Sequence, residues 1–560
     1  MILPVPQQYL RTGNRVKLPS NKLLGVHGDY VLQAEKWLLT WGLVLDSSYN
    51  LLISISLKEE ADRKVTEAYR LEINTCKDQQ HIAEFKLYCS CERGMRNGLN
   101  TIAKLLENAE LESGTIEDYP KFRIRGMIEG FYGWPWKQPQ RLSMLEVISK
   151  YNMNCYFYAP KDDLYLRDKW YERYDTENLS ILQELVEKAR QCCLDFYYCL
   201  SPGITISYTN QMHFESLIQK LQQVYALGVR HFGILLDDIP NTLQYPEDKE
   251  RFPSIAEAHA YFVNRLVDYL QDFDASIKLA LCPLQYYGSG EEEYIRAFSA
   301  LLPKDVMLFW TGENICSQKL TVAAAQEFRE YTGHAPLYWD NYPVNDANMV
   351  NEMHLGPVIG REKELYHYSH GIIANGMPYC EASKIPYITI AGFLWNPDQY
   401  RPEGAWSEAT RRIVGENDAP VFMYFAEHMR RSCLQDDMHS ASLAKCLFDV
   451  RFHLKTGQKA VAEKILERYL DGVNRCEQML KAGMENSVLQ KELSRWEEKF
   501  FVYCKLLNLA YECIRKRDDK LVSEILAMQD SYNNMCAVLT DFCFEEFLDE
   551  VTQKFKEEKK

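Results

Sequence analysis

Hydrophobic residues along the 560-residue chain fall into three successive patterns. In the first 118 residues, short apolar stretches at Tyr30–Leu32 and Tyr69–Ile73 predict strands. Residues 97–107 repeat leucine and isoleucine at helical spacing and predict an amphipathic helix. The mixture of strands and helices predicts a small α/β domain over residues 1–118.

Between residues 119 and 418, short apolar runs alternate with amphipathic helices. Near-continuous apolar strands joined by helices are typical of a parallel sheet that is buried on both faces. Eight such units match the size of a (β/α)8 TIM-type barrel, and a doubly wound open sheet is the alternative. The eight predicted strands are Phe122–Glu129, Asn154–Ala159, Asp195–Leu200, Phe232–Leu236, Lys278–Cys282, Val306–Trp310, Ala335–Trp339 and Gly371–Ala374.

The pattern changes again beyond residue 418, and Pro420 is the last proline of the chain. Apolar residues then recur at helical spacing from Leu443 to Leu454, from Ile465 to Leu480 and from Leu493 to Ile514. Such stripes are what a helix bundle buries in its core. We therefore predict an α-helical bundle domain over residues 419–560.

Composition narrows the class of protein. The chain has 64 Lys and Arg against 79 Asp and Glu, a net charge of −15, so we expect no nucleic-acid partner. No apolar run approaches the roughly 20 residues that span a bilayer, so no membrane partner is expected. The first residues lack the basic and apolar segments of a secretory signal, and the 17 cysteines form no CxxC pair. Cysteines without the spacing of a disulfide framework favour a cytoplasmic location.

Polar and aromatic residues follow the predicted strands at their carboxyl ends, where barrel enzymes place their active sites. Aromatic rings stack on sugar faces and Asp or Asn bonds to hydroxyls, so this set favours a carbohydrate ligand. The sharpest feature is Asp237-Asp238, directly after the fourth strand. Two crowded carboxylates cannot ionise independently, and such a pair suits glycoside hydrolysis. The alternative is that one Asp caps the next helix while the other faces solvent.

Other chemistries lack their motifs in this sequence. None of the 12 histidines forms an HxH pair, and His367 and His370 precede the eighth strand, so we expect no metal site. No GxGxxG, P-loop or GxSxG motif occurs, which leaves nucleotide cofactors and a serine triad without an anchor. We therefore expect no cofactor, and Cys282 at the end of the fifth strand is expected to pack in the core.

The order of the motifs resembles glycoside hydrolase family 84, the β-N-acetylglucosaminidases that include protein O-GlcNAcases. The resemblance covers the whole predicted barrel and implies a retaining enzyme that hydrolyses terminal β-linked GlcNAc by substrate-assisted catalysis. The matching segments are RGMIEGFYG at 125–133, YAPKDD at 158–163, SPG at 201–203, LDDI at 236–239, WTG at 310–312, WDN at 339–341 and Asn375.

The resemblance also implies a role for each site residue. The 2-acetamido oxygen of the substrate would attack the anomeric carbon and form an oxazoline, so no enzyme nucleophile is needed. Asp237 would orient the acetamido N–H, and Asp238 would serve as general acid and then as general base. The acetamido pocket would be shaped by Tyr286, placed ahead of Tyr287 by its position after Cys282-Pro283, with Trp339 and Asn341, and the sugar hydroxyls would be held by Gly130, Lys161, Asp346 and Asn375.

Substrate, activity and assembly stay open at this level. The substrate would be β-GlcNAc on a glycoprotein or a glycan. A non-catalytic GlcNAc- or glycoprotein-binding module on a barrel scaffold is the alternative function, although the intact pair Asp237-Asp238 favours the enzyme. The amphipathic C-terminal helices are compatible with a homodimer.

Overall fold

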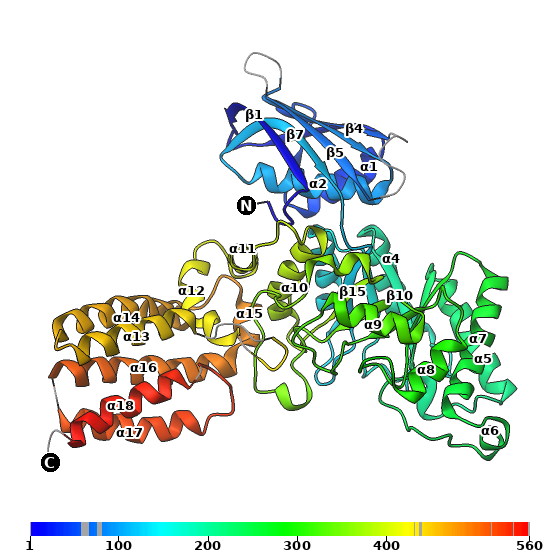
Figure 1. Ribbon diagram of the computed structural model, residues 1–560. Helices are drawn as coiled ribbons and strands as arrows, with labels where there is room; N and C mark the ends of the chain where they lie inside the picture. The colour runs from blue at the N-terminus through cyan, green and yellow to red at the C-terminus, as the bar shows by residue number, and fades with distance from the viewer. Residues whose placement is uncertain are drawn as a thin grey trace.

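The computed structural model describes residues 2–57, 67–75, 81–430, 432–435, 440–516, 518–540 and 542–557. Three bodies follow one another along the chain: a sheet with two helices, a closed barrel and a helical bundle (Figure 1). In Figure 1 the sheet lies above the barrel, and the bundle extends to one side of it.

The first body is a seven-stranded mixed sheet in the order β1-β7-β5-β6-β4-β2-β3. Buried and less buried residues alternate along its strands, as expected for a sheet with one covered face. The predicted strand Tyr69–Ile73 lies within β5, and the predicted helix over residues 97–107 lies at the end of α2. The elements are β1 (Gln8–Lys17), β2 (Leu23–Gly28), α1 (Val31–Thr40), β3 (Val44–Leu45), β4 (Leu51–Leu57), β5 (Tyr69–Thr75), β6 (Ala83–Cys89), α2 (Glu92–Leu106) and β7 (Glu110–Asp118).

The strand predicted at Tyr30–Leu32 is wrong. Helix α1 begins at Val31, and Tyr30 is its N-cap residue in a left-handed conformation. The apolar residues that follow are spaced by three and then one, which puts Ala34, Trp37 and Leu38 on a single buried helix face. A three-residue window is too short to show that period.

Helix α2 lies between the sheet and the barrel, and nearly all its residues are buried. The side chain of Asn100 donates to the carbonyl of Ser149 at 2.8 Å, and the Lys104 ammonium donates to the carbonyl of Lys150 at 2.8 Å. Both acceptors belong to the end of α3 (Gln138–Lys150), the first helix of the barrel. These contacts fix the first body against the base of the barrel.

All eight predicted barrel strands are present, and they close into a parallel barrel, so the alternative of an open sheet is wrong. The strands are β8 (Ile124–Glu129), β9 (Cys155–Tyr158), β10 (Asp195–Leu200), β11 (His231–Leu235), β12 (Lys278–Cys282), β13 (Met307–Trp310), β14 (Pro336–Asp340) and β15 (Gly371–Asn375). Between them lie α4 (Thr176–Gln191), α5 (Gln211–Tyr225), α6 (Pro246–Arg251), α7 (Ile255–Phe273), α8 (Glu293–Ala300), α9 (Val322–Thr332) and the short helices η1 (Pro202–Ile204), η2 (Ala347–Met349) and η3 (Lys363–His367).

Side chains fill the inside of the barrel. Tyr197 stacks on Phe157 with ring centroids 4.0 Å apart, Phe157 meets Phe309 at 5.4 Å, and Phe309 meets Trp339 at 5.5 Å. This aromatic column runs from the amino end of β10 to the carboxyl end of β14. The barrel is therefore a packed core with two separate ends, not a channel.

The last body is helical, as the spacing predicts. The stripe from Leu443 to Leu454 lies in α13, that from Ile465 to Leu480 in α14, and that from Leu493 to Ile514 begins one residue before α16. Within the described residues, no helix is both long enough and apolar enough to cross a membrane. Two helices come between β15 and this body: α10 (Cys380–Trp395), which packs on β8, β15 and α3 of the barrel, and α11 (Pro402–Val414), which packs on α10. The elements of the last body are α12 (Ala419–Ala426), η4 (Glu427–Met429), α13 (Ala441–Lys455), α14 (Lys459–Ala482), α15 (Ser487–Glu492), α16 (Ser494–Lys516), α17 (Asp519–Asn533) and α18 (Cys543–Glu557).

Candidate active site

A pocket of about 210 Å³ lies at the carboxyl end of the barrel strands. Loops after six strands and the last residue of β15 line it, which is the usual place for the site of a barrel enzyme. The pocket brings together every residue that the sequence predicts for the site: Gly130, Lys161, Asp237, Asp238, Tyr286, Trp339, Asn341, Asp346 and Asn375. Their catalytic and binding roles stay predictions.

The paired carboxylates reach one pocket because the backbone turns between them. Strand β11 ends at Leu235, and Asp238 has a left-handed φ of 52°. Asp and Asn tolerate this conformation better than most residues, so the turn is accessible to this sequence. The next helix, α6, has Tyr245 at its N-cap, so the alternative that one of these Asp residues caps it is wrong.

Asp237 is the buried member of the pair, with 6% of its surface exposed. Its Oδ2 accepts a hydrogen bond from the Lys161 ammonium at 2.9 Å. Burial lowers the pKa of Lys161, but the charge of Asp237, its hydrogen bond to the ammonium and the charge of Asp238 together leave the pKa above its ordinary value. The other oxygen, Oδ1, is buried and has no hydrogen-bond partner in the described part of the chain. The pocket therefore contains one buried carboxylate oxygen, Asp237 Oδ1, that can accept a hydrogen bond from a ligand.

Asp238 is more exposed and sits in a different network. The Tyr132 hydroxyl donates to its Oδ2 at 2.8 Å, and the Tyr286 hydroxyl donates to its Oδ1 at 3.3 Å. The Arg167 guanidinium donates to the Tyr132 oxygen at 3.0 Å and to the backbone carbonyl of Asp238 at 3.2 Å. Since Arg167 occupies the Tyr132 oxygen as an acceptor, it directs the hydroxyl proton toward Asp238.

Tyr132 and Arg167 are site residues that the sequence reasoning missed. Tyr132 falls inside the segment 125–133 that carries the family resemblance, so that motif could have pointed to it. Arg167 follows YAPKDD by four residues, in a loop without regular structure. No local spacing shows that it reaches back to Tyr132.

An amide network forms the wall of the pocket. The Trp339 indole N–H donates to Asn341 Oδ1 at 3.1 Å, and Asn375 Nδ2 donates to the same oxygen at 3.2 Å. The backbone N–H of Gly130 in turn donates to Asn375 Oδ1 at 3.2 Å. A Cβ at Gly130 would lie 2.5 Å from the Trp339 ring, so only glycine fits at this approach.

Two acidic residues hold the loops around this wall. Asp346 accepts from the backbone N–H of Tyr132 at 2.8 Å, and burial raises the pKa of its carboxyl. Asp340 forms a two-point ion pair with Arg361 at 2.6 and 2.8 Å, so it points away from the pocket and fixes the end of β14.

The two candidate tyrosines after β12 separate clearly. Tyr286 lines the pocket and contacts Asp238, whereas Tyr287 is 37% exposed and is absent from the lining.

Cys282 also lines the pocket, and burial raises the pKa of its thiol, with the charge of Asp237 as the next cause. Such a thiol stays protonated near neutral pH. Among the described residues, no group of three or more His, Cys, Asp or Glu side chains is arranged to hold a metal ion.

A comparison with models of protein families identifies the family to which the chain belongs. The model described as beta-N-acetylglucosaminidase matches residues 125–427, which contain every predicted site residue. The chain belongs to glycoside hydrolase family 84. It is therefore a member of a hydrolase family, which does not favour the alternative of a non-catalytic binding module.

Relatives of the family agree with this match. The protein O-GlcNAcases of Rattus norvegicus and Mus musculus are each 34% identical over 272 residues, which is 48% of this chain and 29% of theirs. This chain thus spans less than a third of their length. A solved mutant of O-GlcNAc hydrolase from Thermobaculum terrenum is 31% identical, with a TM-score of 0.72 over 78% of this chain and 95% of that chain. The structure of CpGH84B, 24% identical, has the same fold with a TM-score of 0.84 over 98% of this chain and 100% of that chain.

Proposed function

We propose that this protein is a retaining β-N-acetylglucosaminidase of the O-GlcNAcase type that removes terminal β-linked GlcNAc through an oxazoline intermediate. The unused Oδ1 of Asp237 carries this proposal, because an acetamido N–H is the donor that such a buried acceptor requires. The position of Asp238 beside it, at the open side of the pocket, supplies the second carboxyl group.

In the first step, the acetamido carbonyl oxygen attacks the anomeric carbon and the bond to the leaving oxygen breaks. Asp238 gives its proton to that leaving oxygen, so the aglycone departs as an alcohol. Asp237 accepts the acetamido N–H and stabilises the positive charge that develops on the ring of the oxazoline. The Lys161 ammonium holds Asp237 in place through its other oxygen.

In the second step, Asp238 takes a proton from water as the water attacks the anomeric carbon. The bond between that carbon and the acetamido oxygen breaks, which restores the acetamido group and gives GlcNAc with its β configuration retained. Two inversions at one carbon account for the retention, and no enzyme nucleophile takes part.

Protein-linked GlcNAc is the substrate class that we favour. The relatives from rat and mouse are protein O-GlcNAcases, and the one from Thermobaculum terrenum is an O-GlcNAc hydrolase. In the lining of the pocket, Tyr132 and Ile315 are 41% and 44% exposed, so apolar surface borders the opening. Such surface suits a polypeptide aglycone. The cytoplasmic location, the homodimer and the domain boundaries stay predictions.

Hydrolysis of an aryl β-N-acetylglucosaminide, compared with the matching β-glucoside in the presence of EDTA, tests the proposal. We expect release from the acetamido sugar alone. Release from both sugars would contradict acetamido participation, and saturable GlcNAc binding without any release would return the binding module as the function. Faster release from a GlcNAc-bearing peptide than from a GlcNAc disaccharide would support the protein substrate.

A further inference from the structure

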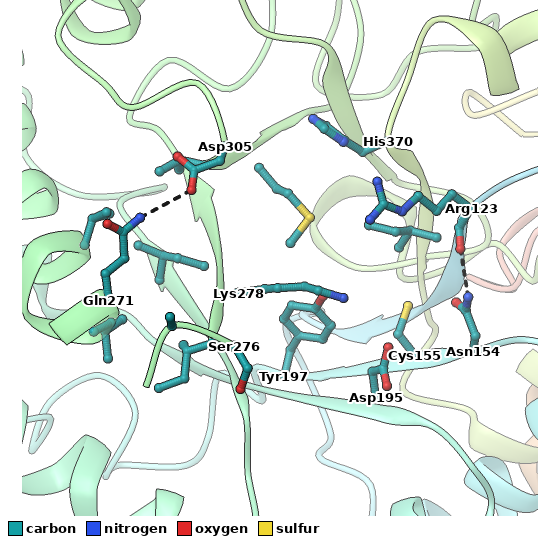
Figure 2. Close-up of a pocket in the computed structure, with 18 of the residues that line it drawn as sticks. Arg123, Asn154, Cys155, Asp195, Tyr197, Gln271, Ser276, Lys278, Asp305 and His370 are labelled. Atoms are coloured by element: carbon teal, nitrogen blue, oxygen red, sulfur yellow. Dashed lines mark hydrogen bonds between the residues drawn. The ribbon is translucent and has the colours of Figure 1, made fainter. Parts of the chain in front are cut away.

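The amino end of the barrel holds a second and larger pocket, of about 540 Å³ (Figure 2). Its walls come from the first residues of β8, β9, β10, β12 and β13, from the end of α7 and from the first turn of α2. The aromatic column from Tyr197 to Trp339 separates it from the candidate active site. The proposed glycosidase chemistry does not use this pocket.

An ion-pair network forms one wall of the pocket. Arg93 donates to Asp195 at 2.7 Å and to Glu67 at 3.1 Å. Glu67 also pairs with Arg125 and accepts from Asn154 at 2.9 Å. Both carboxylates are therefore bonded to guanidinium groups.

Two further cations in the pocket are not neutralised. Neither Arg123 nor Lys278 forms an ion pair within the part of the chain that the structure describes. In Figure 2, Arg123 lies beside His370, and the Lys278 ammonium points toward the side that carries Arg123 and Asp195. Asp305 lies on the opposite side and accepts from Gln271 at 3.4 Å.

The balance of charge at this side of the pocket is positive. Arg93 and Arg125 neutralise the carboxylates Glu67 and Asp195, so Arg123 and Lys278 add two positive charges at this side. The Asp305 carboxylate on the opposite side reduces the excess of the whole pocket to one. The whole chain carries a net charge of −15, so the excess is local. Two cations without carboxylate partners on one side of a pocket attract an anion.

Neutral donors border the same side. Tyr197 stacks on His231 with centroids 4.9 Å apart, and no hydrogen bond of its hydroxyl group is found among the described residues. Burial lowers the pKa of His231 to about 4; the charge of Asp195 opposes this shift, and Lys278 and Arg93 add to it. Burial also lowers the pKa of His370, and Arg123 adds to the effect. Both rings are therefore neutral at pH 7, and each carries one N–H donor.

We propose that this pocket binds a small phosphate monoester, with its phosphoryl group between Arg123 and Lys278. A guanidinium offers two parallel N–H donors to a phosphate, and an ammonium adds a point charge. The Tyr197 hydroxyl supplies a neutral donor at the base of the pocket. A volume of about 540 Å³ has room for an organic group the size of a sugar beside the phosphoryl group.

Isothermal titration of the full chain with inorganic phosphate, glucose 6-phosphate and glucose at low ionic strength tests this site. We expect one saturable site for both phosphates and none for glucose. The double variant Arg123→Gln/Lys278→Gln should bind both phosphates at least about tenfold more weakly, because two charge-assisted contacts are lost. Lys445→Gln, which removes an exposed charge on α13, is the matched control and should bind like the wild type.

The titrations of the wild type and the double variant either support or overturn the phosphate site. Arg123 and Lys278 are exposed side chains without ion pairs among the described residues, so unchanged thermal unfolding is expected for the double variant. Arg123→Lys on its own should keep part of the affinity. An absence of saturable phosphate binding, equal binding of glucose, or equal affinity in the wild type and the double variant would overturn the proposal. Because hydrolysis of aryl GlcNAc is measured separately, failure here leaves the proposed function untouched.

Discussion

The two ends of the barrel are built from the same eight strands but differ in the sign of the charges that form no ion pair. At the carboxyl end, Asp237, Asp238 and Asp346 face one ammonium, that of Lys161. At the amino end, Arg123 and Lys278 form no ion pair among the described residues, and the nearby carboxylates Glu67 and Asp195 are already paired with arginines. An acidic site stabilises a cationic transition state, whereas a basic pocket attracts an anion. One scaffold therefore provides two chemically different pockets that a packed aromatic column keeps apart.

The ends also differ in how they are assembled. Each predicted residue of the candidate active site lies at the carboxyl end of a barrel strand or in the loop after it, so all of them belong to the barrel. The basic pocket takes Glu67 and Arg93 from the first body, which packs on the barrel through α2. Hence a change in the first body is expected to disturb the amino end before it reaches the catalytic end.

The largest effect is expected at the carboxyl end, from Asp238→Ala. Turnover of an unactivated GlcNAc glycoside should fall by about 10²–10⁴, the usual contribution of a general acid. An aryl glycoside with a good leaving group should lose less in its first step, because it needs little protonation. Asp272→Asn, an exposed carboxylate near the other end, is the control. Full activity of Asp238→Ala toward the unactivated glycoside would contradict the role.

At the amino end, Glu67→Gln should destabilise the fold. Burial raises the pKa of Glu67, but Arg125 and Arg93 outweigh this and bring it from 4.5 to about 2. The ionised pair therefore contributes stability above pH 4.5, and this is lost as the pH falls toward 2. We expect the variant to lose about 3 kcal/mol of unfolding free energy at pH 7.

Chemical denaturation at several pH values measures this loss. Glu72→Gln removes a carboxylate whose ion pair with Arg70 is largely exposed, so it should cost less than about 1 kcal/mol. The difference between the two variants should shrink below pH 4.5. Equal stability of both variants at pH 7 would mean that the network at the amino end does not join the two bodies.

Gly130→Ala should damage the sugar pocket without removing an acid or a base. The new methyl group would meet the Trp339 ring at 2.5 Å, and overpacking of this kind costs about 1–3 kcal/mol. We expect KM for an aryl GlcNAc glycoside to rise about tenfold as the ring moves. Gly42→Ala is the control: its φ of 72° strains an alanine, but the site lies in the first body and the methyl group meets nothing within 4 Å, so KM should stay normal even if stability falls. An unchanged KM in Gly130→Ala would show that the ring yields freely.

The smallest effect is expected from Arg167→Ala. Without the guanidinium, Tyr132 loses the contact that directs its proton to Asp238, and kcat/KM should fall about tenfold. The loss should be greater for an unactivated glycoside than for an activated one, and Arg167→Lys should recover part of it. Arg173→Ala, an exposed arginine of the same loop, should behave like the wild type. Equal losses on both substrates would indicate a structural role only.

Much of the barrel could be predicted because its information is local. Each strand is a short apolar run, and the residue that follows it belongs to the carboxyl end by the geometry of a parallel barrel. That is why the nine predicted site residues meet in one pocket. The strand at Tyr30–Leu32 was wrong because three residues cannot distinguish the period of a strand from that of a helix.

The parts that could not be predicted depend on distant contacts. Arg167 reaches Tyr132 across 35 positions of sequence, and Arg93 reaches Asp195 across 102. No periodicity or motif predicts such contacts, because they depend on how the folded parts of the chain pack against one another. The basic pocket is therefore visible only in three dimensions.

The rate of hydrolysis across a series of aryl glucosaminides with zero to three fluorine atoms on the N-acetyl methyl group tests the central claim most directly. Fluorine withdraws electrons from the carbonyl oxygen and weakens it as a nucleophile. If that oxygen attacks the anomeric carbon while Asp237 holds its N–H, kcat/KM falls at every step of the series. A rate that does not depend on fluorine would contradict substrate-assisted catalysis at this site.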